Sequence, residues 1–261
     1  MDWRSFFEEH QTLLEQNYPG LTLSRFLREA GEIGGDGEAF LRGIPFAYLL
    51  GYAEFGPIKL KVTPDTLIPR PETEQLYELV CAELSAHPHW RRAVDVGTGP
   101  GTLGLALAKT FPKLQLTLTD VSEAALAVCR ENVALLGPKD VRVLESDLLA
   151  EVVGLFDLIV SNPPYIPASS RGVHPKTHEF EPHLALYLGD EEYDAFFQRF
   201  FHQVARRLTQ EGSFFMEGHE DRLDELARIA DAERLTSVSV LRDLSGRKRF
   251  LRARAPRVPI G

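Results

Sequence analysis

The stretch AVDVGTGPGTLGLALA, residues 93–108, decides the fold of this chain. A short apolar run ends at Val96, glycines follow at positions 97, 99 and 101, and an apolar helical pattern begins directly after them. Glycine lets the backbone turn tightly and lets a ligand approach it closely. A strand, a glycine-rich turn and a helix in this order are typical of nucleotide-binding proteins, and a tight turn without a ligand is the alternative.

Outward from this turn, strand and helix patterns alternate to the end of the chain. Such alternation predicts an α/β fold of the Rossmann-like kind, with a mostly parallel seven-stranded sheet and helices on both faces. In such sheets ligands bind at the carboxyl ends of the strands, here just after Val96, Thr119, Glu145 and Ser161. The expected strands are Ala93–Val96, Gln115–Thr119, Val141–Glu145, Asp157–Ser161, Ser213–Met216, Thr236–Leu241 and Phe250–Arg254.

Residues 1–52 have a different pattern and are predicted to form a small helical N-terminal domain. Further helices are expected near Leu23–Glu29 and Glu38–Leu50, with a break at Gly34-Gly35-Asp36-Gly37 between them. A bundle of this size is too small to be the catalytic domain. The apolar residues whose spacing places them on one face of the first helix are Trp3, Phe6, Phe7, Leu13 and Leu14.

Residues 53–74 are expected to connect the helical domain to the sheet. The segment Ala53–Val62 predicts a short hairpin that turns at Gly56-Pro57. Three prolines in Thr63–Glu74 forbid a regular helix and favour an extended path, until a helix begins near Pro71. The remaining residues, 75–261, form the third region, which contains the sheet.

The composition is that of an acidic protein. Its 29 lysines and arginines and 38 acids give a net charge of −9, which argues mildly against a dedicated nucleic-acid binder, because binding to phosphates needs many cations. No apolar run is long enough for a signal peptide or a membrane span, so we expect a cytoplasmic protein. We also expect no metal site and two reduced thiols. The residues concerned are Cys81, Cys129, His10, His174, His178 and His219.

The charge is distributed unevenly along the chain. Residues 242–261 contain seven lysines or arginines and a single acid, Asp243. A solvated edge strand is the simpler explanation of this segment. Contact with RNA or with an acidic partner is the other explanation.

The strand ends indicate an adenosine-containing cofactor. Asp95 suits the cationic S-adenosylmethionine better than the pyrophosphate of NAD, and Gly-x-Gly-x-Gly differs from the dinucleotide spacing. Asp120 ends the second strand, where a carboxylate can accept the ribose hydroxyls of either cofactor. After the third strand, Asp147 is a candidate acceptor for the adenine amino group, with Leu148 against the ring. A helix N-cap is the alternative role for Asp147.

The fourth strand runs directly into Asn162-Pro163-Pro164-Tyr165, the most specific signal in the chain. The prolines hold the backbone rigid. The Asn162 side-chain oxygen and the Pro163 carbonyl can accept both hydrogens of one NH2 group, and Tyr165 offers a flat face to a planar acceptor. Such a pair orients the nitrogen lone pair and stabilises the positive charge that grows on nitrogen. The tetrapeptide therefore predicts methyl transfer to a planar NH2 group, without deciding between an amide and a nucleobase.

Six segments of the chain match the signatures of one enzyme family. They are RGIPFAYLLG (42–51), LIPRPETE (67–74), DVGTGPG (95–101), SNPPYIP (161–167), FEPHLAL (180–186) and RDLSGRKRF (242–250). In these segments the chain resembles the release factor glutamine methyltransferases, the PrmC or HemK family.

The resemblance implies a class I S-adenosylmethionine-dependent methyltransferase domain, with a hairpin linker and a helical N-terminal domain that recognises the substrate. It implies methylation of the N5 amide of the glutamine in the Gly-Gly-Gln motif of class 1 peptide-chain release factors. An N-methyltransferase that acts on an exocyclic amine of adenine or guanine in nucleic acid is the alternative.

The resemblance also assigns roles to individual residues. The residues implied to contact the cofactor are Gly97, Thr98, Gly99, Pro100, Gly101, Asp120, Leu148 and Asn162. Those implied to hold or wall the substrate are Asn162, Pro163, Pro164, Tyr165, Pro69, Arg70, Glu72 and Thr73, with Asn162, Pro163 and Tyr165 at the catalytic centre. The chain departs from the family pattern at Glu191-Glu192 and at Met216. Both departures are expected to lie away from the tetrapeptide.

Overall fold

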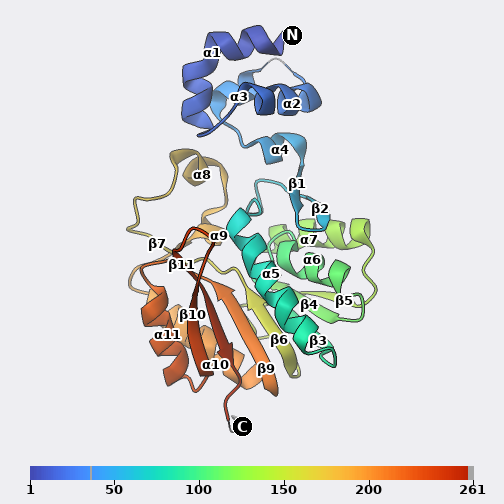
Figure 1. The fold of residues 1–261 in the computed structure, drawn as a ribbon, viewed down its shortest axis with the longest axis vertical. Coiled ribbons are helices and arrows are strands. Elements are labelled where there is room, and N and C mark those ends of the chain that lie inside the picture. The colour runs from blue at the N-terminus through green and yellow to red at the C-terminus, as the bar shows by residue number, and fades with distance from the viewer. Residues whose placement is uncertain (36, 258–261) are drawn as a thin grey trace.

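The computed structural model describes residues 1–35 and 37–257, so Asp36 of the predicted break and the end of the basic segment lie outside the described residues. Its main feature is the predicted mostly parallel seven-stranded sheet, flanked by helices (Figure 1). The strands in spatial order are β10 (Thr236–Arg242), β11 (Lys248–Arg254), β9 (Leu208–Glu217), β6 (Phe156–Ser161), β3 (Arg92–Val96), β4 (Gln115–Asp120) and β5 (Val141–Glu145).

The directions of these strands confirm the prediction. Strands β3, β4, β5, β6 and β9 pair in parallel, and β11 runs antiparallel to both β9 and β10. Strand β9 begins at Leu208, five residues before the predicted Ser213. The polar residues 209–212 resemble a turn in the sequence, but Leu208 pairs with Phe156 and extends the strand.

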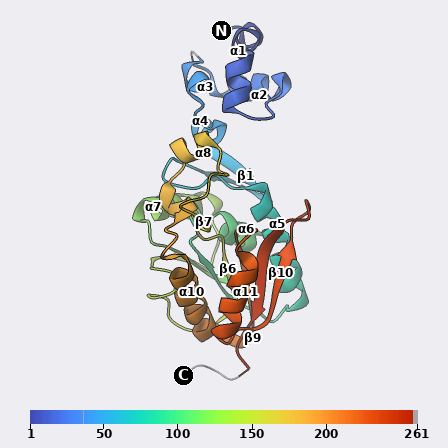
Figure 2. The ribbon, with the colours of Figure 1, turned by 90° about the vertical axis from the view of Figure 1, so that its left-hand side faces the viewer.

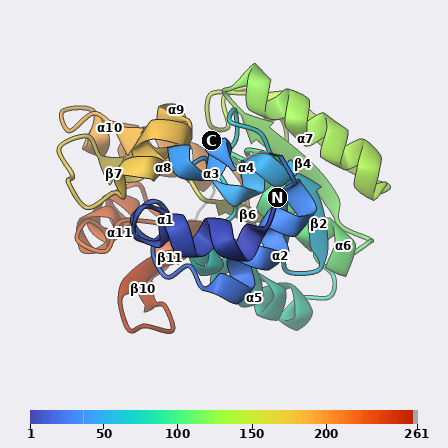
Figure 3. The ribbon, with the colours of Figure 1, turned by 90° about the horizontal axis from the view of Figure 1, so that it is seen from above.

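Helices cover both faces of the sheet (Figure 3). On one face lie α5 (Pro71–Ala86), α6 (Thr102–Thr110) and α7 (Glu123–Leu136), whose apolar residues pack with the sheet around Leu107 and Leu118. On the other face lie α10 (Tyr193–Arg207) and α11 (Leu223–Ala232), which pack around Phe197 and Phe214. The central strands are therefore buried on both sides, as their apolar sequences require.

The N-terminal helices lie at one end of the molecule and join the rest through the hairpin (Figures 1 and 2). They are α1 (Trp3–Asn17), α2 (Leu23–Ile33), α3 (Glu38–Arg42) and α4 (Phe46–Leu50). The single helix predicted for Glu38–Leu50 is wrong, because Gly43 adopts a left-handed φ of 78° that ends α3, and Pro45 then precedes α4. Leu13 was predicted to share one helix face with Phe7 and Leu14, but it is 41% exposed while those two residues are buried.

The predicted hairpin is confirmed. Strands β1 (Tyr52–Phe55) and β2 (Ile58–Lys61) pair antiparallel around Gly56-Pro57, and α5 begins at Pro71 with proline at its first position. Between β6 and α10 the chain forms a small substructure that the sequence did not predict. Its elements are β7 (Ile166–Pro167), α8 (Pro175–Phe180), α9 (His183–Leu186) and β8 (Tyr187–Leu188).

The prediction of a solvated edge strand for the basic segment is wrong. Strand β11 lies inside the sheet, between β9 and β10, and intramolecular acids pair with its cations. The carboxylate of Glu83 on α5 forms ion pairs with the guanidinium groups of Arg252 and Arg254, with N–O distances of 2.8 Å and 2.7 Å. Arg249 lies 3.4 Å from Asp243, and Lys248 pairs with Asp224.

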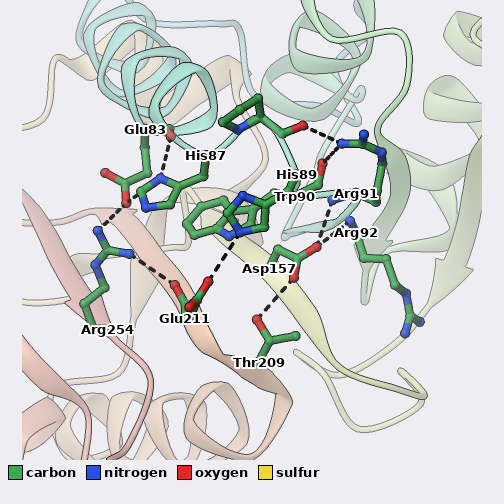
Figure 4. A network of polar contacts seen from close by, with 11 residues as sticks. Glu83, His87, His89, Trp90, Arg91, Arg92, Asp157, Thr209, Glu211 and Arg254 are labelled. Atoms are coloured by element: carbon green, nitrogen blue, oxygen red, sulfur yellow. Dashed lines mark hydrogen bonds and ion pairs between the residues drawn. The ribbon is translucent and has the colours of Figure 1, made fainter.

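A polar network closes the amino-terminal end of the central strands (Figure 4). The Asp157 carboxylate accepts from the backbone N–H groups of Arg91 and Arg92, and His89 contacts Glu211 at 3.3 Å. Ligands bind at the opposite end of such sheets, so this network stabilises the fold rather than the site. Within the described ranges, we find no helix that is long and apolar enough to cross a membrane.

Candidate active site

The glycine-rich turn between β3 and α6 leaves open space above its backbone. Gly97 and Gly99 have φ values of 69° and 56°, which side chains other than glycine rarely adopt. A Cβ atom built on Gly99 would meet no atom within 4 Å, and one on Gly97 would reach only the Asn162 carbonyl oxygen at 4.0 Å. A ligand can therefore lie directly against this turn.

Asp95 connects the turn to the helix that follows it. Its Oδ2 accepts from the Thr98 hydroxyl at 2.6 Å and from the Gly104 N–H at 2.9 Å. The side chain is buried and lines the cavity described below. Burial raises the pKa of Asp95 to about 6, and the nearby Asp120 adds to the effect. A cation beside Asp95 would therefore stabilise its charged form.

Asp120 lies at the carboxyl end of β4, as predicted. One carboxylate oxygen accepts from the Gly99 N–H at 2.9 Å and the other from the Ser122 N–H at 3.0 Å. Burial raises the pKa of this group, and the backbone donors oppose the rise. Each carboxylate oxygen has a further lone pair, so Asp120 retains acceptors for a ligand that lies against Gly99.

Asp147 lies at the cavity but does not cap a helix, because the chain forms a turn at 147–151 and no helix begins there. Its carboxylate instead pairs with both terminal nitrogens of Arg199 on α10, at 2.9 Å and 3.2 Å. The neighbouring Leu148 is buried and has a positive φ of 56°. A ligand that binds the Asp147 carboxylate must therefore share it with Arg199.

One cavity joins the strand ends to the linker. It contains Asp95, Gly97, Thr98, Gly99, Pro100, Asp120, Asp147, Leu148, Asn162, Pro163, Pro164, Pro69, Arg70 and Thr73 from the predicted sets. Gly101, Glu72 and Tyr165 are not among its lining residues. Further lining comes from Pro182, which precedes α9, from Leu184 of α9 and from Tyr187 of β8. The cavity therefore has a glycine-turn end and a tetrapeptide end.

At the tetrapeptide end, a hydrogen bond fixes the amide nitrogen of the Asn162 side chain. Its Nδ2 donates to the Thr73 hydroxyl oxygen at 2.9 Å. The preceding Ser161 is buried and donates to the Val96 carbonyl at 2.7 Å, which ties the ends of β6 and β3 together. Because Thr73 occupies the amide nitrogen, the Asn162 oxygen is left for a ligand in the cavity.

Tyr165 was predicted to offer its flat face to the acceptor, but it does not line the cavity. Its ring packs against the core beneath α10, and its hydroxyl donates to Glu217 at 2.7 Å. Burial raises the pKa of this tyrosine well above the usual range, and the Glu217 charge adds to the rise. Tyr165 therefore contacts the network behind Asn162.

The prediction that the Met216 departure lies away from the tetrapeptide is wrong. Strand β9 pairs with β6 so that Met216 stands opposite Ser161, which places Glu217 beside Asn162. Glu217 is 1% exposed and accepts from both Thr73 and Tyr165, at 2.8 Å and 2.7 Å. Glu191 and Glu192, in contrast, are exposed at the start of α10 and do not line the cavity.

The linker is fixed against the segment before α9. Glu181 is buried and accepts from Arg70 at 2.5 Å and from the Ile68 N–H at 3.1 Å. This pair joins the wall formed by Pro69 and Arg70 to Pro182. In the described residues, no group of three histidine, cysteine or acidic side chains is arranged as a metal site.

The chain is similar to known methyltransferases. Residues 76–175 match the model of the methyltransferase small domain. The release factor glutamine methyltransferase of Deinococcus radiodurans is 38% identical over 93% of this chain and 89% of its own length. That of Moorella thermoacetica is 39% identical over 79% of this chain and 74% of its own length. This chain belongs to the release factor glutamine methyltransferase family.

A solved structure extends the likeness to the fold. The T. thermophilus 16S rRNA N2 G1207 methyltransferase, in complex with AdoMet and guanosine, matches with a TM-score of 0.56 at 18% identity. The match covers 78% of this chain and 49% of that one. In this release factor glutamine methyltransferase homologue, sequence reasoning found the glycine turn and the tetrapeptide but missed Glu217. A lone acid that ends an apolar strand directly before Gly218 is the signal that could have found it.

Proposed function

We propose that this chain transfers a methyl group from S-adenosylmethionine to the N5 amide nitrogen of the glutamine in the Gly-Gly-Gln motif of class 1 peptide-chain release factors. Membership of the release factor glutamine methyltransferase family supports this proposal. The observation that carries it is the Asn162 side chain, whose nitrogen is bound to Thr73 and whose oxygen is left for the cavity. An amide NH2 group is the partner that such an oxygen can accept from.

The glycine-turn end of the cavity fits the cofactor. A carboxylate at Asp120 offers acceptors for ribose hydroxyls, the apolar Leu148 offers a surface for adenine, and the open backbone at Gly97 and Gly99 allows close approach. Asp95 and Asp120 together provide negative charge for a cationic ligand. When bound, the cofactor supplies an electrophilic methyl group.

The tetrapeptide end fits the acceptor. The Asn162 oxygen and the Pro163 carbonyl accept the two hydrogens of the amide and hold its lone pair toward the methyl group. These two acceptors also stabilise the positive charge that develops on nitrogen. Pro163, Pro164 and the anchored wall at Pro69 and Arg70 hold this arrangement rigid and supply the orientation on which the rate depends. The proton leaves the nitrogen after the methyl group has been transferred.

The other regions support the same substrate. We infer that residues 1–52 recognise the release factor, that residues 53–74 wall the acceptor pocket and that residues 75–261 carry catalysis. A substrate used in translation also implies a cytoplasmic location. The segment suggested for RNA contact supplies few free cations, because Glu83, Asp224 and Asp243 pair with it in the described part of the chain.

A single labelling experiment tests this function. Methyl-labelled cofactor is incubated with the protein and with purified release factor, release factor whose Gly-Gly-Gln glutamine is changed to alanine, or total RNA. We expect label only on the unchanged release factor. Label on RNA alone would favour the nucleobase alternative, and equal label on the changed release factor would place the acceptor elsewhere.

A further inference from the structure

A chain of hydrogen bonds with a fixed direction lies behind Asn162. The Asn162 amide nitrogen donates to the Thr73 hydroxyl, at 2.9 Å, and the Thr73 hydroxyl donates to Glu217, at 2.8 Å. The Tyr165 hydroxyl donates to the other carboxylate oxygen of Glu217, at 2.7 Å. Thr73 and Glu217 are 3% and 1% exposed, so water does not compete for these groups.

The chemistry of the three groups decides this direction. An ionised carboxylate has no hydrogen, so Glu217 can only accept. A hydroxyl has a single hydrogen, and the Thr73 hydroxyl gives it to Glu217. The Thr73 oxygen can then only accept from Asn162. The nitrogen of Asn162 must therefore face Thr73, and its oxygen must face the cavity.

Without this constraint the Asn162 amide has two similar orientations. The oxygen and the NH2 group of asparagine are nearly equal in size, so a rotation of the amide exchanges a donor for an acceptor at little steric cost. The exchanged form would present an NH2 group to the NH2 group of the acceptor. Two donors facing each other form no hydrogen bond, and the acceptor nitrogen would lose one of its two partners.

We propose that Glu217 is a positioning residue that acts through Thr73 to fix the Asn162 amide with its oxygen toward the acceptor. This proposal rests on the proposed function and adds Glu217 to its machinery. Secondary structure brings the three residues together. The pairing of Ser161 with Met216 places Glu217 beside Asn162, and Thr73 lies in the first turn of α5.

The protonation state of Glu217 controls the direction. The charged and titratable groups that act on it are Tyr165, Arg249 of β11 and Glu72 of α5, with Thr73 as a neutral donor. Burial raises the pKa of Glu217, while the two hydroxyl donors and Arg249 oppose the rise. Once protonated, Glu217 can donate to Thr73 and remove the constraint. Transfer should therefore fall as the pH drops through this raised pKa.

The test compares Glu217→Gln and Thr73→Val with Thr73→Ser and with the control Glu211→Gln. Glutamine can donate to Thr73, and valine cannot bind Asn162, so both changes release the amide. We expect kcat to fall about tenfold to hundredfold in both, with cofactor affinity nearly kept. Serine retains the hydroxyl, so Thr73→Ser should keep most of the kcat that Thr73→Val loses. Glu211 lies near the start of the same strand, is exposed and does not line the cavity, so its variant should match the wild type. It contacts His89 in the network at the amino-terminal end of the strands (Figure 4).

A second measurement reads the orientation without catalysis. The side-chain NH2 resonances of Asn162 report its hydrogen bond to Thr73. We expect these resonances to shift in Glu217→Gln and to stay near their wild-type positions in Thr73→Ser. We also expect the acid limb of the pH profile of kcat to disappear in Glu217→Gln. Wild-type kcat in both Glu217→Gln and Thr73→Val would overturn the proposal. If one variant fails to fold, the other and the resonances of the wild type across pH decide the question.

These arms separate the two proposals. A wild-type protein that labels no release factor would refute the proposed function, and the Asn162 resonances would still test the orientation. A wild type that labels release factor, with unchanged Asn162 resonances in every folded variant, would refute the orientation alone.

Discussion

At the scale of single residues, acidic side chains in similar places have different tasks. Asp120 offers its carboxylate to the cavity, Asp147 shares its carboxylate with Arg199, and Glu217 accepts from two hydroxyls behind the cavity. Asp95 binds the Thr98 hydroxyl and the Gly104 N–H, which joins the glycine turn to its helix. Burial and partners, rather than residue type, separate these roles.

Replacing Asn162 with alanine should separate transfer from cofactor binding. The alanine removes an acceptor that acts on the amide nitrogen, so we expect kcat to fall by at least about a hundredfold. Calorimetry with the cofactor should give nearly the wild-type affinity, because Asp120 and the glycine turn are unchanged. Turnover by this variant at the wild-type rate would contradict the amide clamp.

The raised pKa of Asp95 predicts a pH-dependent stability. An unfolded Asp95 ionises near 3.8 and the folded one at about 6, so the folded state holds the proton more tightly. Its stabilising contribution is full below pH 3.8 and is lost as the pH rises to about 6. The Asp95→Asn variant has no charge at this position, so its stability does not fall with pH for this reason. We expect its unfolding free energy, relative to the wild type, to improve by about 2–3 kcal/mol from pH 4 to pH 7 in urea titrations. A pH-independent difference would contradict the assignment.

At the scale of elements, close packing positions the glycine turn. A Cβ on Gly104 of α6 would lie 2.3 Å from Leu118 of β4 and 3.0 Å from Asp95. Only glycine allows α6 to approach the sheet this closely, and the approach lets the Gly104 N–H reach Asp95. The position of α6 is therefore coupled to the charge at the glycine-turn end of the cavity.

Gly104→Ala should destabilise the protein although alanine favours helices. The added methyl group must displace Leu118 or move α6, which costs about 1–3 kcal/mol in an overpacked core. Thermal unfolding should show a lower Tm, and cofactor affinity should fall with it because Asp95 moves. A matched Ala106→Gly change on the same helix should lower the Tm without the same loss of affinity.

The sequence predicted the strands and the tetrapeptide because both depend on local patterns. The apolar strands needed no knowledge of their neighbours, and Asn162-Pro163-Pro164-Tyr165 has a fixed geometry. The errors came from tertiary structure. The interior position of β11 depends on the acids of other elements that pair with its cations, and the role of Glu217 depends on the register between β9 and β6. The order of residues does not show the interior position of β11, and the acid directly before Gly218 marks Glu217 without revealing its partners.

At the scale of the whole molecule, Glu83 links helix α5 to two strands of the sheet that lie far from it in the sequence. It lies on α5, accepts from Ser213 of β9 and pairs with Arg252 and Arg254 of β11. The same helix carries Thr73 in its first turn. One buried acid therefore anchors the helix that contributes Thr73 to the tetrapeptide end of the cavity.

Glu83→Gln should weaken this anchor. The loss of the carboxylate leaves two guanidinium groups without their partner, and both are about one-third exposed, so we expect about 1–3 kcal/mol rather than the larger cost of a fully buried pair. Urea unfolding should show a lower midpoint. High salt should narrow the difference from the wild type, because screening weakens the pairs in the wild type. A difference that grows with salt would contradict this account.

The interior position of β11 also has a consequence for biosynthesis. A nascent chain leaves the ribosome with its N-terminus first, so residues 248–254 emerge after every other strand. Until they emerge, β10 has no neighbour in the sheet and Glu83 has no arginine partners. A nascent chain without residues 248–254 thus cannot join β10 to the sheet. The emergence of residues 248–254 is therefore the step that completes the seven-stranded sheet.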